Sequence, residues 1–341
     1  MKKLPVSKIQ ELFAAIRAQQ TLYIPTDDAS GQARYLPWQE GMELTRALNT
    51  VRSAKDFFFP QTENLVEFKL KGKEIEIIDS RTEQDDFVIF GVRACDARSF
   101  TILDKVFLID PIDTYYKNRR EHGTVVTLAC TQPEETCFCT TFGIDPADPE
   151  GDAACWIAGD SLYLKARTEK GERLLSALDN LLADADEGEI AAQQKATRDI
   201  AQKLPFAKLN LAGFNGENLN KLFDSKKWPE LSEACLGCGT CTFVCPTCQC
   251  YDIRDFDTGH GVKRFRCWDS CMYSDFTLMA HGNSRNSQVE RFRQRFMHKL
   301  VYFPANNEGE YGCVGCGRCL AKCPISMNIV KVAKALEGEV Q

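Results

Sequence analysis

The stretch CLGCGTCTFVCPTCQC, residues 235–250, contains six cysteines in sixteen residues. A second stretch, CVGCGRCLAKCP at residues 313–324, repeats the spacing of the first four of them. Both stretches carry the pattern CxxCxxCxxxCP, the ferredoxin motif that ligates a [4Fe-4S] cluster. The two copies therefore predict a domain that binds two such clusters. The motif cysteines are Cys235, Cys238, Cys241 and Cys245 in the first copy, and Cys313, Cys316, Cys319 and Cys323 in the second.

The spacing of these motifs has a mechanical reason. A gap of two residues lets a tight loop wrap three thiolates around three irons, and the glycines of each loop allow unusual backbone dihedrals. In two-cluster ferredoxins the fourth cysteine of each motif ligates the other cluster. We therefore predict crossed ligation, with cluster 1 bound by Cys235, Cys238, Cys241 and Cys323, and cluster 2 bound by Cys245, Cys313, Cys316 and Cys319.

Zinc sites and disulfides are the alternatives for so many cysteines. Zinc sites combine two CxxC knuckles and lack the third cysteine and the proline of this motif. The chain has 17 cysteines, an odd number that complete pairing does not fit, and its N-terminus shows no secretory signal. Dense cysteines in a reducing compartment are metal ligands more often than disulfides. We therefore expect a cytoplasmic iron–sulfur protein.

Charge and hydropathy argue against two classes of protein. The formal net charge is −6, whereas a nucleic-acid-binding domain is expected to carry a basic surface. No apolar run approaches the length of a bilayer-spanning helix. One segment departs from the acidic average, because residues 263–299 carry eight Lys or Arg and three Asp or Glu residues. This segment is either a solvated helix face or a surface that faces anionic clusters or an acidic partner.

The first two thirds of the chain alternate between strand-like and helix-like segments. β-Branched and aromatic runs predict strands, and apolar residues at helical spacing predict helices between them. We predict an α/β domain over residues 1–205, and a mainly α-helical, ferredoxin-like [4Fe-4S] dicluster domain over residues 206–341 with a long insertion at 246–312. The predicted strands are 21–28, 66–79, 87–94, 124–130 and 161–168, and the predicted helices are 6–19, 41–49, 97–108, 172–182, 191–204, 218–234 and 324–340.

A third group of cysteines lies in the predicted α/β domain. Cys95 and Cys130 each come at the end of a predicted strand, and Cys137 and Cys139 lie in the loop EETCFCTTFG. Strand ends and loops converge at the edge of a sheet where ligand sites in α/β domains tend to lie. These four cysteines suffice for one more [4Fe-4S] cluster, although the separation of Cys95 from Cys130 is no local motif. Cys155 is interpreted as a bystander.

Four further cysteines lie in the insertion between the two ferredoxin motifs. Two hypotheses stay open for them. The pairing of CxC with CxxxC is chemically adequate for another cluster, but cysteine also packs as a small buried hydrophobic residue. The four are Cys248, Cys250, Cys267 and Cys271.

Together these motifs resemble the iron–sulfur subunit of anaerobic sulfite reductase and the beta subunit of soluble sulfhydrogenases. The resemblance covers most of the chain and rests on RACD (93–96), CFC (137–139), the two cysteine motifs, RCWDSCM (266–272) and RFRQRFMHK (291–299). It implies an electron-transfer subunit that connects a flavin subunit, which oxidises NAD(P)H, to a catalytic reductase or hydrogenase subunit. It also implies a third cluster at Cys95, Cys130, Cys137 and Cys139, since each falls on a motif position.

Two functional hypotheses follow. The first is an electron relay within an oxidoreductase complex, because the chain lacks a dinucleotide fingerprint, a phosphate-binding loop and a nucleophile elbow of its own. The alternative is a catalytic iron–sulfur reductase that acts on a disulfide or sulfur substrate through an extra cluster. The paired CCG motifs of heterodisulfide reductase catalytic subunits are absent from the sequence, which favours the relay.

Overall fold

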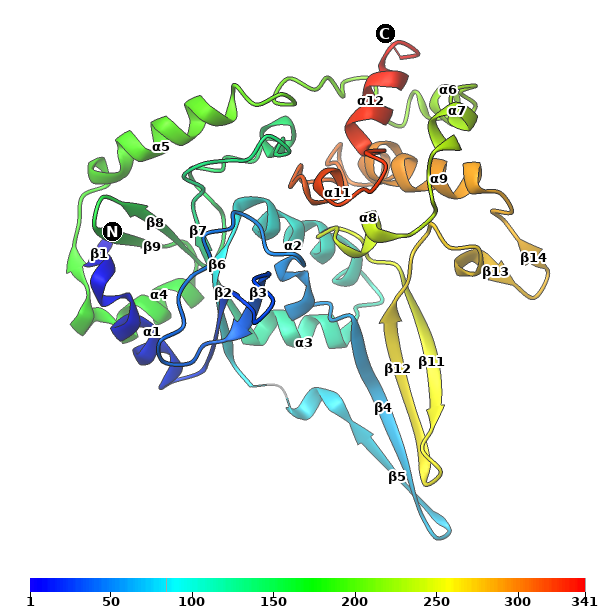
Figure 1. The fold of residues 1–341 in the computed structure, drawn as a ribbon. Helices are drawn as coiled ribbons and strands as arrows, with labels where there is room; N and C mark the ends of the chain where they lie inside the picture. The colour runs from blue at the N-terminus through cyan, green and yellow to red at the C-terminus, as the bar shows by residue number, and fades with distance from the viewer. Residues whose placement is uncertain (84, 341) are drawn as a thin grey trace.

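A computed structural model describes residues 1–83 and 85–340, and the chain forms two sheets of more than two strands (Figure 1). The larger, eight-stranded sheet has the order β10-β1-β9-β8-β7-β6-β2-β3. Its central strands β2, β6, β7 and β8 pair in parallel, whereas the outer pairings are antiparallel, so the sheet is mixed. The strands are β1 (Lys2–Pro5), β2 (Thr21–Asp27), β3 (Ala33–Pro37), β6 (Phe87–Val92), β7 (Gly123–Leu128), β8 (Ala153–Ala158), β9 (Ser161–Ala166) and β10 (Ala183–Asp184).

Helices cover both faces of this sheet. The strand β6, sequence FVIFGV, is buried along its whole length, as expected for a parallel strand with both faces covered. Helices α1 (Ile9–Arg17) and α4 (Glu169–Ala177) pack on the face of Val88 and Phe90. Helices α2 (Ala94–Phe107) and α3 (Thr114–His122) pack on the opposite face. The predicted α/β part is therefore built on a mixed sheet.

The segment 41–49, which was predicted as a helix, is irregular, so this prediction is wrong. Its polar backbone groups bond to other segments, since Thr45 N donates to the carbonyl oxygen of Pro25 at 2.8 Å. Its apolar side chains Met42 and Leu44 pack against the core beneath α1. Contacts with other parts of the chain thus provide hydrogen bonds and packing for residues 41–49, and these contacts override the local helix propensity.

The C-terminal part is a set of short helices around a second core (Figure 1). Aromatic and aliphatic residues of these helices, among them Trp228, Phe292 and Leu336, fill that core. The predicted helix 218–234 is divided into α6 and α7, the second of which begins with a proline in its first turn. Helix α5 (Gly188–Ala201), in contrast, packs on the large sheet, where its Ile190 contacts a cluster that includes Trp156. The helices of the C-terminal part are α6 (Leu219–Phe223), α7 (Trp228–Glu233), α8 (Thr240–Phe243), α9 (Gln288–Met297), the π-helical turn His298–Tyr302, α10 (Phe303–Asn306), α11 (Arg318–Ala321) and α12 (Ile329–Glu337).

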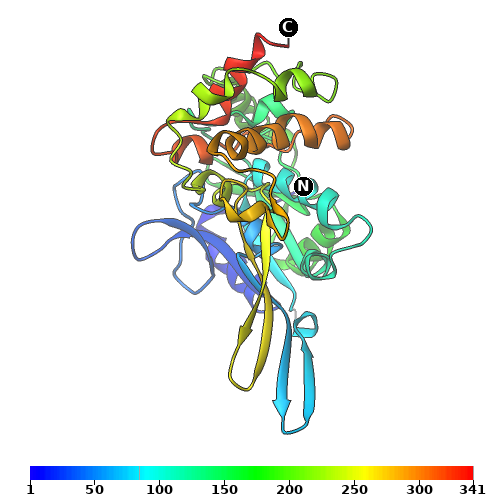
Figure 2. The same ribbon diagram turned by 90° about the vertical axis from the view of Figure 1, so that its right-hand side faces the viewer.

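The insertion between the cysteine motifs adds strands that were not predicted, so the description "mainly α-helical" is not confirmed for this part. Strands β11 (Tyr251–Asp257) and β12 (Gly261–Trp268) form a hairpin, and β12 pairs with β4 (Thr62–Lys71) of the N-terminal part. With β5 (Glu74–Asp79) they make a four-stranded antiparallel sheet of order β11-β12-β4-β5. We call this sheet the arm, because both hairpins project from the body in two perpendicular views (Figures 1 and 2). A short hairpin, β13 (Leu278–Met279) with β14 (Gly282–Asn283), follows it.

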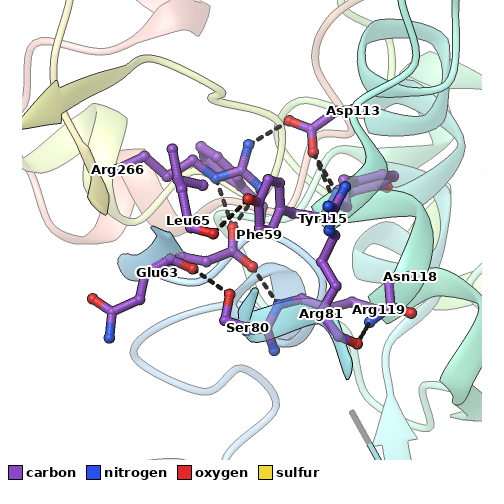
Figure 3. A network of polar contacts seen from close by, with 12 residues as sticks. Phe59, Glu63, Leu65, Ser80, Arg81, Asp113, Tyr115, Asn118, Arg119 and Arg266 are labelled. Atoms are coloured by element: carbon purple, nitrogen blue, oxygen red, sulfur yellow. Dashed lines mark hydrogen bonds and ion pairs between the residues drawn. The ribbon is translucent and has the colours of Figure 1, made fainter. Parts of the chain in front are cut away.

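A buried ion-pair network holds the base of the arm against the body (Figure 3). Arg266 of β12 pairs with Glu63 of β4 at 2.6 Å and with Asp113, which caps helix α3. Arg119 of α3 donates to the other oxygen of Glu63, also at 2.6 Å.

The tip of the arm is different, because Leu70 and Ile77 lie exposed on one face. No helix in the described ranges is long and apolar enough to cross a membrane.

Candidate iron–sulfur sites

The two cysteine motifs have the same local backbone. In each, a glycine in the left-handed region comes directly before a short helix: Gly239 (φ +71°) before α8 and Gly317 (φ +77°) before α11. Residues with a side chain rarely adopt such angles, which is why the motif needs glycine there. The loop carries the first two cysteines of each motif, the short helix carries the third (Cys241 or Cys319), and the fourth follows the helix.

The loops of the two motifs enclose two separate cavities, each lined by four cysteines. Cavity 1 is closed by Met272, Phe292 and other apolar side chains. Cavity 2 lies on the other side of Arg295, against Lys299. Each cavity takes its fourth cysteine from the other motif, which is the grouping that crossed ligation requires. The cysteines are Cys235, Cys238, Cys241 and Cys323 in cavity 1, and Cys245, Cys313, Cys316 and Cys319 in cavity 2.

The third group is gathered at one edge of the large sheet. Cys95 lies in the first turn of α2 after β6, and Cys130 follows β7, so both sit at the carboxyl ends of parallel strands. Cys139 interacts electrostatically with Cys130 and Cys137, and Cys95 interacts with Cys139. The group also adjoins cavity 2, because Cys316 interacts with Cys95, Cys137 and Cys139. Residues far apart in sequence therefore meet here. Cys155, in contrast, lies in the core of the large sheet, away from this group.

Burial sets the chemistry of these thiols. It raises the pKa of Cys137 to about 12, and it shifts the pKa of Cys95, Cys130 and Cys139 in the same direction. Such thiols ionise only when a cation compensates the charge, and a coordinated metal deprotonates a thiol outright. The donor set therefore fits a bound metal group.

A cluster and a single metal ion require different spacings of their thiol ligands. Within residues 1–83 and 85–340, no three His, Cys, Asp or Glu side chains come close enough together to hold one metal ion. Four thiolates around a cubane lie further apart than four around a zinc ion, since the irons stand between them. The motif that supplies the cysteines of cavities 1 and 2 is the one that ligates [4Fe-4S] clusters.

Part of the basic segment 263–299 faces the cysteines and not the solvent. Arg295 is 3% exposed and lines both cavities, and its Nε has no hydrogen-bond partner among the described residues. Lys299 is equally buried, and its Nζ donates to Thr247 Oγ1 at 2.7 Å and to the carbonyl oxygen of Gly312 at 3.0 Å. Arg295 and Lys299 therefore fit the interpretation in which the basic segment faces anionic clusters, and not the one in which it is a solvated helix face. Arg266 serves the base of the arm.

Sequence reasoning missed two buried residues beside the cysteines. Arg318, between two cysteines of the second motif, forms a bidentate ion pair with Asp96, with a contact of 2.7 Å from Nη2 to Oδ2. Lys55 lies against the insertion, where its Nζ donates to the carbonyl oxygen of Cys248 at 2.9 Å. The charged pair at RACD and CGRC was visible in the sequence, but nothing local predicted that the two would meet.

The four insertion cysteines do not form one group. Cys248 shares a thiol hydrogen bond with Cys245, and Cys250 shares one with Cys271. Cys267 lies within β12, opposite Thr62 of β4. Side chains alternate along a strand, and its neighbours Arg266 and Trp268 are the residues that turn into the body. Cys267 therefore points away from the other three.

Comparison with known proteins agrees with this geometry. Residues 234–327, which contain both cavities' motif cysteines, match the family described as a 4Fe-4S dicluster domain. The chain is thus an iron–sulfur electron-transfer protein with [4Fe-4S] clusters, and the predicted cofactor is confirmed. It is 34% identical over 285 residues to sulfhydrogenase 2 subunit beta of Pyrococcus furiosus, an alignment that covers 83% of this chain and 82% of the relative. The chain belongs to the family of sulfhydrogenase beta subunits, as the resemblance predicted. No solved structure matches it.

Proposed function

We propose that this chain is the iron–sulfur subunit of an oxidoreductase complex and relays electrons through three [4Fe-4S] clusters. The clusters supply one-electron transfer when bound. In this proposal, cluster 1 is held in cavity 1 by Cys235, Cys238, Cys241 and Cys323, cluster 2 in cavity 2 by Cys245, Cys313, Cys316 and Cys319, and cluster 3 by Cys95, Cys130, Cys137 and Cys139.

The observation that carries the proposal is the continuity of the three thiol groups. Cys316 of cavity 2 interacts with the thiols of the third group on one side. Arg295 is shared by cavities 1 and 2 on the other side. A connected series of metal sites, buried in protein, is the arrangement that an electron path needs. A single catalytic centre would not require three groups of ligands.

The partners and the domain organisation belong to the same proposal. The relative is named as a subunit, which supports a role in a multi-subunit complex for this chain. We infer that one partner is a flavin subunit that oxidises NAD(P)H and that the other is a terminal reductase or hydrogenase subunit. Residues 1–205 would carry cluster 3, and residues 206–341, with the insertion 246–312, would carry clusters 1 and 2.

Iron counting tests the number of clusters. Anaerobically purified protein should contain about twelve irons and as many acid-labile sulfides, four for each cubane. Cys95→Ser should lower the count to about eight, whereas Cys155→Ser, a matched buried cysteine outside the three groups, should leave it at twelve. A count of about eight in the unaltered protein would remove cluster 3, and bound zinc without iron would contradict the whole assignment.

A second measurement tests the relay. The isolated chain should be reduced by dithionite but should not oxidise NADH or NADPH until a flavoprotein partner is added. Oxidation of either nucleotide by the chain alone would show that it is not a simple relay.

A further inference from the structure

Four thiols of the insertion remain outside the proposed ligand sets, and the fold brings two of them, Cys250 and Cys271, into contact. Cys250 directly precedes β11, and Cys271 follows the end of β12. The antiparallel ladder continues past both strand ends, since Asp269 N donates to the carbonyl oxygen of Cys250 at 2.9 Å. At this end of the hairpin, the backbone N–H and the thiol of Cys271 both donate to Cys250 Sγ. Strand pairing therefore brings Cys250 and Cys271 to the same end of the hairpin.

The segment that carries Cys271 is anchored on both sides. Ser270 is fully buried, and its hydroxyl accepts a hydrogen bond of 2.8 Å from Thr242 of α8. Trp268 Nε1 donates to the carbonyl oxygen of Phe59 at 3.1 Å. These contacts with two other segments hold the WDSC segment in place, so the position of Cys271 at the end of the hairpin is fixed by its surroundings.

The surroundings of the pair are cationic. Lys55, 1% exposed, stacks over the ring of Trp268 at 3.6 Å, and Lys299 lies on the side of cavity 2. The hydrogen bond from Cys271, with smaller contributions from both lysines, lowers the pKa of Cys250 to about 7, whereas the same contact raises the pKa of Cys271. Lysine neighbours favour the thiolate, which is the reactive form of a cysteine in thiol–disulfide exchange.

The pair also lies beside the proposed electron path. Cys248 interacts with Cys250 and donates a hydrogen bond to Cys245, a proposed ligand of cluster 2. The thiols Cys245, Cys248, Cys250 and Cys271 therefore form a continuous series that leads away from cavity 2. A further metal site does not explain this series. A [4Fe-4S] cluster would need a fourth thiol beside Cys248, Cys250 and Cys271, but Cys267 points elsewhere and Cys245 belongs to the proposed ligand set of cluster 2.

We propose that Cys250 and Cys271 are a redox-active dithiol pair, a two-electron site next to the one-electron path. In the oxidised state a disulfide joins the two sulfurs. Its reduction consumes two electrons and two protons, breaks the S–S bond and leaves two thiols. The electron donor is a low-potential one-electron reductant, and its identification with a reduced iron–sulfur centre at cavity 2 rests on the proposed function.

Differential thiol labelling of the intact, cluster-loaded protein tests the pair. The protein is equilibrated anaerobically with mixtures of reduced and oxidised dithiothreitol, then denatured in acid, alkylated and digested. Mass spectrometry should find a Cys250–Cys271 disulfide at the oxidising end and two alkylated cysteines at the reducing end, in one reversible two-electron transition. This measurement needs no variant. Two alkylated cysteines at every mixture, with iron retained, would overturn the proposal.

Variants separate this inference from the proposed function. Cys250→Ser and Cys271→Ser should each abolish the transition and leave the iron content unchanged, because neither residue belongs to a ligand set. Cys267→Ser, a control on the same hairpin, should retain the transition. Loss of about four irons in Cys250→Ser would overturn the dithiol assignment in favour of a cluster ligand. Failure of the three-cluster proposal would appear in the iron count of Cys95→Ser, which this experiment does not involve.

Discussion

At the scale of single residues, the buried guanidinium of Arg295 indicates that the group bound beside it is negatively charged. A buried cation without a carboxylate costs several kcal/mol unless an anion lies nearby. Burial opposes the charge, yet the thiols Cys241 and Cys319 keep the pKa of Arg295 above its ordinary value. These thiols come from both cavities. The side chain is therefore placed to compensate the negative charge that two clusters and their thiolates bring.

Replacing this cation should shift the reduction potentials of the clusters. Arg295→Gln should lower the potentials of clusters 1 and 2, because reduction adds negative charge that the cation stabilises. The expected shift is on the order of 60 mV, or tenfold in a one-electron equilibrium. Redox titration followed by electron paramagnetic resonance measures it, with iron content determined on the same sample.

Two variants serve as controls for this prediction. Arg295→Lys, which keeps the charge, should retain most of the potential. Arg293→Gln on the same helix should have little effect, because the Arg293 guanidinium stacks on the ring of Phe223 at 3.6 Å and lines neither cavity. Unchanged potentials in Arg295→Gln, with full iron content, would refute the electrostatic role.

At the scale of elements, the loop of the second motif and the loop that carries Cys137 and Cys139 are packed backbone to backbone. Phe138 N donates to the carbonyl oxygen of Gly315 at 2.9 Å. A Cβ on Gly315 would come within 2.4 Å of the Phe138 carbonyl oxygen, so only glycine fits there. This close approach is what places the third thiol group beside cavity 2.

Gly315→Ala should therefore disturb two cluster sites at once. The left-handed angle alone costs an alanine roughly 1–2 kcal/mol, and the clash adds about 1–3 kcal/mol as overpacking. Gly309→Ala isolates the first contribution, since Gly309 has a similar φ of +82° and open space around its Cα. Gly315→Ala should melt well below Gly309→Ala and lose iron from both sites. Equal melting temperatures and equal iron contents would show that the approach of the two loops is unimportant.

At the scale of the whole molecule, one buried ion pair connects the large sheet to the second cysteine motif. Asp96 is fully buried in α2, and Arg318 in α11 meets it with two nitrogens. Arg318 Nε also donates to the carbonyl oxygen of Thr50 at 3.0 Å. The pair joins residues 222 positions apart in the sequence. Asp96 directly follows Cys95, and Arg318 comes two residues after Cys316.

Removing one partner of this pair should be costly. Asp96→Asn leaves the Arg318 charge buried without its counterion, so the protein should lose about 3–5 kcal/mol of stability. Glu150→Gln is the matched control. Glu150 forms a surface ion pair with Arg98, which lies in the same helix as Asp96. Loss of this exposed pair should cost less than about 1 kcal/mol. Thermal unfolding of both variants measures the difference. Similar melting temperatures would mean that the buried pair contributes no more than the exposed one.

Much of this protein is determined by local sequence. The spacing CxxCxxCxxxCP is a property of each loop's own sequence, so the [4Fe-4S] cofactor could be predicted from the residues alone, whereas the crossed ligation stays a prediction. Strands such as β6 were predictable for a similar reason, because a continuous apolar run needs both faces covered. The family was also recognisable, because its motifs are short and contiguous.

Only the tertiary structure decided which distant residues meet. The helix predicted at 41–49 does not form, because the side chains of this segment pack against a core that is built by other parts of the chain. The pairing of β12 with β4, the orientation of Arg295 between two cavities and the contact of Cys250 with Cys271 all depend on the path of the chain. Residue spacing carries no information about such contacts, since they arise where separate elements are packed together. The proposed ligands of clusters 1 and 2 thus follow from local sequence motifs, whereas the fold determines which charges and thiols lie around them.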